Sequence, residues 1–207
     1  MHLDEKLLQM RMESKKQEEV TKHLQDIKED ILRQEREQKP IEEWVRELTC
    51  NLVDIKGVKY VCEKKRVVDN HIGIYFFPED VEKIIEDSNV ATIIHHTLEI
   101  GINVTFLNQP AVIKNQKEFQ AKLIRQYKQD KLDYCPLDAG VLTSGKYKVC
   151  FAEGIATSAV GGVFINNFFC GGKKRTIIGN YSCRLTERYS LGNLFRAMLT
   201  QMFEEDK

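Results

Sequence analysis

The fold is decided by residues 147–185, which read YKVCFAEGIATSAVGGVFINNFFCGGKKRTIIGNYSCRL. Apolar residues alternate along three segments of this stretch, as expected for strands with one buried face. Gly161-Gly162 and Gly171-Gly172 separate the segments and suit turns. The pattern predicts a three-stranded antiparallel meander. The residues that share a face in each strand are Tyr147, Val149 and Phe151; Val163, Ile165 and Phe169; and Ile177, Tyr181, Cys183 and Leu185.

A helix is expected directly after the meander. Ser190 is a residue type that caps helices well. The apolar residues that follow it are spaced three or four apart, which gives a broad stripe of the kind that covers a sheet. They are Leu191, Leu194, Phe195, Met198, Leu199, Met202 and Phe203.

Upstream of the meander, the sequence predicts a helix and a hairpin. Pro40 suits the first turn of a helix, and an apolar stripe that includes the only Trp, Trp44, follows it; Gly57 is expected to end this helix. Residues 58–68 and 71–77 are rich in Val, Ile, Tyr and Phe, and Asp69-Asn70 between them suits a hairpin turn. This hairpin weakly resembles the 170–176 region, so a duplicated half-domain and chance similarity both stay open.

Residues 79–107 fit more than one pattern. Glu79 to Asp87 is interpreted as a short helix, and residues 89–107 fit either a helix or a strand. A strand over all of 90–106 would far exceed the average of about 5–6 residues. We therefore predict a helix to Glu99 and a strand from Ile102 to Leu107. Asn115 and Glu118 form a capping-box pattern, which predicts a helix with Phe119, Leu123 and Tyr127 on its apolar face.

These elements predict an α+β fold. The expected architecture is an antiparallel sheet, made of a hairpin and the C-terminal three-stranded meander, with helices on one face. It occupies residues 40–207 and carries a charged N-terminal helical arm, residues 1–39.

The arm holds the clearest candidate for partner binding. Residues 3–38 contain no Gly or Pro and are dense in strong helix formers. Val20, Leu24, Ile27 and Ile31 follow a 4-3-4 spacing, which is typical of a short coiled-coil seam. We expect the arm to bind a partner helix or a second copy of the chain, and a homodimer is the first expectation.

Composition narrows the class of protein. The 207 residues carry 31 basic and 31 acidic side chains, so no overall field favours nucleic acid or an acidic membrane. No signal-peptide pattern or long apolar run is present, which predicts a soluble cytoplasmic protein without membrane contact. Its six cysteines are then expected to be thiols: Cys50, Cys62, Cys135, Cys150, Cys170 and Cys183.

Candidate chemistry is sparse in this sequence. No close pairs of Cys or His have zinc-site spacing, so neither a metal nor a cofactor is predicted. Cys170 is the best candidate nucleophile, because nearby cations could lower its pKa, with His71, His95 or His96 as the base. A small thiol in a strand is more often a core residue.

The turn after Cys170 is a candidate anion site. Lys173, Lys174 and Arg175 follow two glycines. A P-loop would require a helix after them, but a strand is predicted here. Phe168, Phe169 and Tyr181 flank this turn, and Lys122, Arg125 and Lys128 line a helix, so single-stranded nucleic acid is an alternative ligand.

The sequence therefore favours a non-catalytic binding or assembly protein acting through the arm and the α+β domain. A Cys-dependent or phosphoryl-recognising enzyme is the first alternative. A nucleic-acid-binding module is the second.

Overall fold

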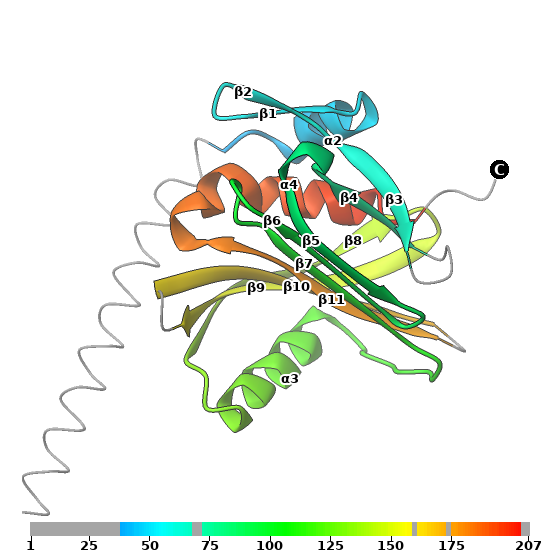
Figure 1. Ribbon diagram of the computed structural model, residues 1–207. Helices are drawn as coiled ribbons and strands as arrows, with labels where there is room; N and C mark the ends of the chain where they lie inside the picture. Colours follow the sequence, from blue (N-terminus) through cyan, green and yellow to red (C-terminus); the bar gives the residue numbers. More distant parts are fainter. Residues whose placement is uncertain (1–37, 68–71, 159–160, 173–174, 204–207) are drawn as a thin grey trace, which may run out of the picture. The chain divides into compact units, whose positions relative to one another are not determined.

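The computed structural model describes residues 38–67, 72–158, 161–172 and 175–203 (Figure 1). The chain divides into two compact units, residues 1–38 and 39–207, and the description below concerns the second. The seam residues Val20, Leu24, Ile27 and Ile31 lie outside the described residues. The same is true of His71, Lys173 and Lys174.

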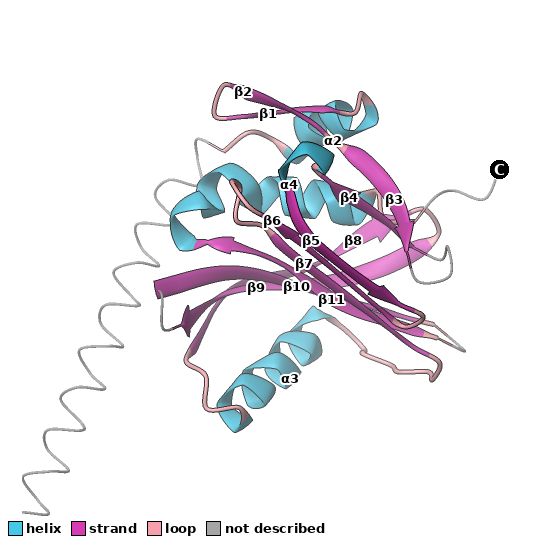
Figure 2. Ribbon diagram, in the orientation of Figure 1, coloured by secondary structure: helices cyan, strands magenta, loops and turns pink. Residues whose placement is uncertain are grey.

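The second unit is an α+β fold built on a seven-stranded antiparallel sheet with the order β5-β6-β7-β11-β10-β9-β8 (Figure 2). Hairpin connections link β5 to β6 to β7 and β8 through β11, and β11 pairs with β7 in the middle. The strands are β5 (Val81–Asp87), β6 (Val90–His95), β7 (Gly101–Leu107), β8 (Tyr134–Ser144), β9 (Tyr147–Ser158), β10 (Gly161–Gly171) and β11 (Thr176–Arg184).

One face of the sheet carries the main core. Helix α4 (Arg188–Thr200) follows a 3₁₀ turn, η3 (Leu185–Glu187), and packs against β8, β10 and β11. Phe195 of α4 is fully buried and stacks on Tyr181 of β11, with ring centroids 5.3 Å apart. The apolar stripe predicted for this helix is confirmed, since Leu191, Leu194 and Met198 are buried as well.

Helix α2 (Ile41–Thr49) packs on α4 and extends the same core. It begins directly after Pro40, as the sequence predicts, but it ends at Thr49 and not at Gly57, because residues 52–55 form a strand. Two small sheets accompany it, β1 (Leu52–Ile55) with β2 (Val58–Val61), and β3 (Glu63–Val67) with β4 (Ile72–Phe76). The predicted hairpin of 58–68 with 71–77 is therefore correct only for β3 and β4, because residues 58–61 pair with β1.

The opposite face of the sheet carries helix α3 (Gln116–Gln129), which packs on β8 and β9 (Figure 1). Phe119 is buried there with Cys150, Ala152 and Phe169 in a separate small core. Helices thus lie on both faces, and the expectation of helices on one face was wrong. In β9 and β10, apolar side chains point to both faces of the sheet, so both faces are stabilised by packing against other elements.

Two of the predicted helices are strands. Residues 78–80 form a 3₁₀ turn, η2 (Pro78–Asp80), and the predicted helices 79–87 and 89–99 are largely β5 and β6. Ala91, Ile93 and His95 alternate as buried residues of β6, whereas β5 is an edge strand whose side chains are almost all exposed. An edge strand of this kind carries little alternating signal.

The C-terminal meander has four strands, not three, because β8 precedes it and pairs with β9. The α4 helix also begins earlier than predicted. Its N-cap is Glu187, so Ser190 lies inside the helix.

Candidate functional site

An open cleft of about 780 Å³ lies on the α3 face of the sheet, at the end of β10. Its floor comes from β8, β9 and β10, through Val141, Cys150 and Phe169. Its wall is the loop between β7 and α3, together with the first residues of α3. The lining residues are Pro110, Ala111, Val112, Ile113, Lys114, Asn115, Gln116, Val141, Lys148, Cys150, Phe169, Gly171 and Gly172.

Local contacts hold the cleft wall in place at both ends. At its start, Thr176 Oγ1 donates to the Gln109 carbonyl at 2.9 Å. At its end, Asn115 Oδ1 accepts from Glu118 N at 3.0 Å, and Glu118 Oε2 accepts from Lys114 N at 2.9 Å. The predicted cap by Asn115 is confirmed, and the carboxylate of Glu118 closes the motif one residue earlier than a standard capping box.

Gly171 allows the loop to approach the sheet. A Cβ atom at this position would lie 2.4 Å from the carbonyl oxygen of Ala111 and 2.8 Å from the Phe169 ring. Any larger residue would therefore push the wall away from the floor. The Gly171-Gly172 pair that the sequence suggests for a turn also shapes one end of the cleft.

The charged lining residues among those described are both lysines. Lys148 Nζ donates to the neutral Thr143 Oγ1 at 2.8 Å. Lys114 lies near Glu118, whose carboxylate also pairs with Lys122 Nζ at 3.0 Å. The hydrogen bond from Lys114 N and the contact with Lys122 lower the pKa of Glu118. Glu118 offsets part of the positive charge at the Lys114 end, but its carboxylate also pairs with Lys122, so the rim keeps a net positive charge around an apolar floor.

Cys170 lies outside this cleft, on the α4 face of β10, where it is buried in the main core. Burial, with a smaller contribution from the nearby Cys150, raises the pKa of its thiol to about 11. This direction is opposite to the one that a nucleophilic thiolate needs. Among the proposed bases, His95 is not available for this role, since both of its ring nitrogens contact main-chain atoms of Phe77 and Ile100.

The described residues give little support to anion binding after Cys170 or to nucleic-acid binding by the aromatic residues around that turn. Arg175 lies over the ring of Phe106, 5.4 Å from its centroid. Phe168 and Tyr181 are fully buried against each other in the main core, and Phe169 packs on Phe119. These aromatic rings are therefore not an exposed stacking platform.

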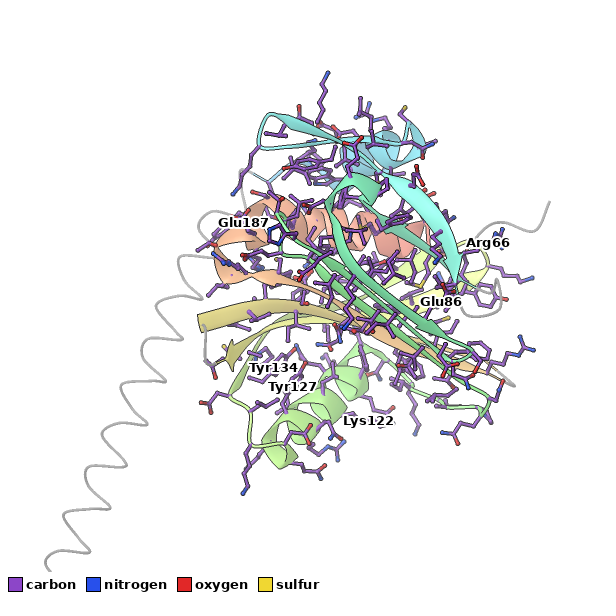
Figure 3. The ribbon with its side chains drawn as sticks, viewed as in Figure 1. Arg66, Glu86, Lys122, Tyr127, Tyr134 and Glu187 are labelled. Carbon is purple, nitrogen blue, oxygen red and sulfur yellow. The ribbon has the colours of Figure 1, made fainter. Side chains whose placement is uncertain are left out.

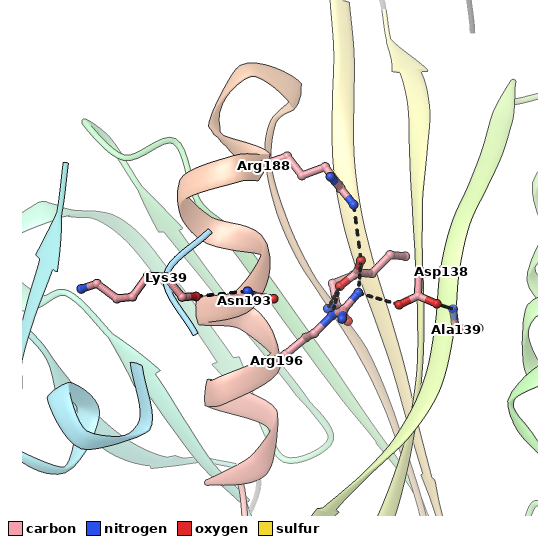
Figure 4. Close-up of polar contacts among 8 residues, drawn as sticks. Lys39, Asp138, Ala139, Arg188, Asn193 and Arg196 are labelled. Atoms are coloured by element: carbon pink, nitrogen blue, oxygen red, sulfur yellow. Dashed lines mark hydrogen bonds and ion pairs between the residues drawn. The ribbon is translucent and has the colours of Figure 1, made fainter. Parts of the chain in front are cut away.

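A buried ion-pair cluster, which no sequence pattern predicts, joins the sheet to α4 (Figure 4). Glu153 of β9 is 1% exposed and accepts from Arg196 Nε at 2.6 Å and from Arg196 Nη2 at 2.7 Å. Asn166 Nδ2 donates to Glu153 Oε1 at 3.1 Å, and Arg188 Nη2 lies 3.9 Å from Oε2. Burial alone would lower the pKa of Arg196, but its contacts with Glu153 and Asp138 raise it overall.

A second polar group lies between α3 and the sheet. The rings of Tyr127 and Tyr134 stack with centroids 4.3 Å apart (Figure 3). Tyr127 donates a long hydrogen bond of 3.5 Å to Asn167 Oδ1. Burial raises the pKa of both tyrosines. These contacts hold the C-terminal end of α3 on the sheet, whereas the cleft lies at its N-terminal end.

The start of the second unit is anchored at Lys39. Its Nζ donates to Glu47 Oε1 at 2.6 Å and to the Asp54 carbonyl at 3.0 Å, and it lies 3.8 Å from the centroid of the Trp44 ring. The Lys39 carbonyl accepts from Asn193 Nδ2 of α4 at 3.1 Å (Figure 4). The chain thus enters the domain through a residue tied to α2, β1 and α4.

Within the ranges that the structure describes, no group of three or more His, Cys, Asp or Glu side chains is arranged to hold a metal ion. In the same ranges, no helix is both long and apolar enough to cross a membrane. All six cysteines are free thiols.

No family model matches the sequence, and no curated protein matches it. The fold is similar to the solution structure of cyanobacterial PsbP (CyanoP) from Synechocystis sp. PCC 6803. The TM-score is 0.55 at 7% identity, over 68% of this chain and 91% of that one. This likeness concerns the fold alone.

Two crystal structures are more distant. One, from Bacteroides thetaiotaomicron VPI-5482, has a TM-score of 0.44 at 8% identity, over 70% of this chain and 48% of that one. The other is a protein of unknown function, PA94 from Pseudomonas aeruginosa, titled a putative regulator. It has a TM-score of 0.43 at 4% identity, over 70% of this chain and 99% of that one.

Proposed function

We propose that this protein is a non-catalytic binding or assembly protein, in which the domain 40–207 holds an arm, residues 1–39, that binds a partner helix or a second copy of the chain. The anchoring of Lys39 is the observation that carries the proposal. Side-chain and main-chain contacts to three elements fix the point at which the chain enters the domain. A fixed attachment point lowers the conformational entropy that an arm loses when it binds a partner.

The seam supplies the binding energy in this proposal. Val20, Leu24, Ile27 and Ile31 are apolar residues at 4-3-4 spacing in an otherwise charged stretch. Full burial of each side chain against a partner contributes about 1.5–3 kcal/mol before the cost of ordering the chain. Two-fold assemblies are the commonest closed oligomers, so a homodimer is the first expectation.

Light scattering on the full-length protein tests the arm. The wild-type particle should have twice the mass of one chain, and Leu24→Asp with Ile27→Asp should halve it, because two carboxylates would replace the centre of the seam. Lys22→Gln with Gln25→Asp is the matched control, since it changes the net charge by the same amount away from the seam. An unchanged mass in the seam variant would contradict the proposal. A monomeric wild-type protein would exclude self-association and leave either a different partner helix or an arm that docks on its own domain.

A further inference from the structure

The cleft beside the β7–α3 loop has the size and lining of a small-molecule site. Its volume of about 780 Å³ falls within the range of about 300–1,000 Å³ that such sites occupy. Val112 in the wall is 76% exposed, and Val141 in the floor is 45% exposed. Both aliphatic side chains are therefore exposed to water. A bound apolar chain would bury them, and the hydrophobic effect would then favour binding.

The floor favours a non-peptide occupant. Of the three floor strands, β9 and β10 are interior strands whose main-chain groups are hydrogen-bonded to neighbours on both sides, and β8 is the last strand of the sheet. An extended peptide lying on this floor would leave its own amide groups without strand partners, which is costly in an apolar site. A flexible alkyl or aryl chain has no such groups to satisfy.

The rim favours a negative charge. Lys114 and Lys148 come from different elements and line the same cleft. The hydrogen-bond partner of Lys148 Nζ is a neutral hydroxyl, and an ammonium has two further N–H groups to donate. The first turn of α3 opens at Gln116 in the same lining and adds the partial positive charge of a helix N-terminus.

We propose that the cleft binds a single-chain amphipathic anion, with its apolar chain on Val141, Cys150 and Phe169 and its acidic head at Lys114 and Lys148. The proposal is independent of the arm and of its partner. It adds a ligand site to a domain that the proposed function treats only as a holder of the arm.

Competition with a fluorescent amphiphile tests the ligand class. The full-length protein is titrated with dansylaminoundecanoate below its micelle concentration, and the probe is then displaced with laurate, dodecanol or acetate. Laurate should displace the probe from one saturable site per chain, dodecanol should do so more weakly, and acetate should have no effect. The absence of saturable binding would overturn the proposal. Equal displacement by laurate and dodecanol would overturn the role of the charged head.

Rim variants test the two lysines. Lys114→Met and Lys148→Met keep the apolar stem and remove the charge, so each should weaken laurate binding by about 2–5-fold, as exposed charge pairs do, and leave dodecanol unaffected. Lys128→Met, at the other end of α3, is the control and should change neither ligand. Unchanged laurate affinity in both rim variants would overturn the assignment of the head group.

A floor variant locates the site. Val141→Glu should weaken laurate binding by at least about tenfold, because the new carboxylate lies in the apolar floor and repels the head group. Ile94→Glu is the matched control, since Ile94 is 37% exposed on the same face of the sheet, on β6, which β7 and β11 separate from the floor strand β10, and lies outside the cleft lining. Both variants change an exposed side chain, and unchanged melting temperatures will show that both are folded.

The floor variant also separates other occupants. Equal loss in Val141→Glu and Ile94→Glu would overturn the location. Displacement of the probe by an acidic hexapeptide but not by laurate would overturn the proposal in favour of a protein partner. Tighter probe binding in the Leu24→Asp, Ile27→Asp variant would overturn it in favour of the arm as the natural occupant.

Discussion

The two faces of the seven-stranded sheet differ in how fully they are covered. The α4 face is closed by α4 and α2, and its aromatic residues Phe164, Tyr181 and Phe195 are fully buried. On the α3 face, the helix that the structure describes is α3, which packs on β8 and β9. Ile178 and Val141, on the same face, remain partly exposed.

Two adjacent rows of residues across the sheet show the contrast most directly. Ile93, Ile102 and Tyr181 are register partners on the α4 face, and all three are fully buried. The neighbouring residues of the same three strands point to the α3 face, and this row is polar. Thr92 Oγ1 donates to Asn103 Oδ1 at 2.9 Å, and Asn103 Nδ2 donates to Asn180 Oδ1 at 3.2 Å.

We expect the closed face to determine the stability of the fold and the open face to determine ligand binding. Substitutions on the closed face should destabilise the fold, because they remove packing that no solvent can replace. Substitutions on the open face should mainly change what binds there. The predictions that follow test this separation, from the largest expected effect to the smallest.

Phe195→Ala should reduce the free energy of unfolding by about 3–5 kcal/mol, as truncation of a buried phenylalanine does. The ring stacks on Tyr181 and lies 6.3 Å from the Phe164 ring, so its loss leaves a cavity in the centre of the core. Urea denaturation measures the change. Phe119→Ala, in the small core under α3, should cost less, and an equal or larger loss there would contradict the contrast between the faces.

Glu153→Ala should cost about 3–5 kcal/mol, because it leaves the charge of Arg196 without its buried carboxylate partner. Asp138→Asn is the control at the outer end of the same cluster. The Asp138 side chain is 50% exposed and contacts the same guanidinium at 2.7 Å. Its loss should therefore cost no more than about 1 kcal/mol in the same denaturation assay. Similar costs for both variants would show that the cluster is screened by solvent throughout.

The sequence allowed prediction of elements whose signals are local. Asn115 and Glu118 lie three residues apart and cap α3 as expected. The stripe from Leu191 to Met202 is buried as a whole, because α4 covers the sheet along its length. Residues 79–99 were misread because β5 is an exposed edge strand, and because Ile93 and Ile94, adjacent in the sequence, lie on opposite faces of β6.

The cleft and the ion-pair cluster could not be predicted in the same way. The cleft combines residues 110–116, 141–150 and 169–172, which meet only when β8, β9 and β10 are paired and α3 folds back. Glu153 is an isolated acid in an apolar strand, and its partners Arg188 and Arg196 come from α4. No local spacing links such residues. The glycine pair 171–172 predicts a turn. Its second role, to let the loop at Ala111 approach the sheet, depends on a contact between residues far apart in the sequence.

His95 should make the closed face sensitive to acid. It is buried, and its Nε2 accepts from Phe77 N at 3.0 Å, so the neutral ring is required. Burial lowers its pKa below the ordinary 6.5, although the Ile100 carbonyl and Asp80 oppose this shift. The unfolded chain then binds more protons than the folded one, so stability should fall as the pH drops below about 6.5.

The acid effect is measured as the difference in unfolding free energy between pH 7.5 and pH 5.5, at about one unit on each side of the ordinary histidine pKa. His95→Gln keeps an acceptor and a donor but does not titrate, so it should lose less stability than the wild type over this range. His96→Gln, at the exposed neighbouring position, should behave as the wild type does. Identical pH dependence in all three proteins would exclude His95 as the titrating group.

Asn115→Ala should give the smallest of these effects, about 1 kcal/mol, because it removes one side-chain cap from α3 and leaves the Glu118 amide to water. The matched control is Ser190→Ala. The sequence suggests that Ser190 caps α4, but it lies inside that helix, so its loss should stay within about 0.5 kcal/mol. Thermal unfolding of both variants measures the difference. Because Asn115 also lines the cleft, its variant should weaken laurate binding where Ser190→Ala does not, and equal behaviour of the two in both assays would show that the start of α3 has no special role at the open face.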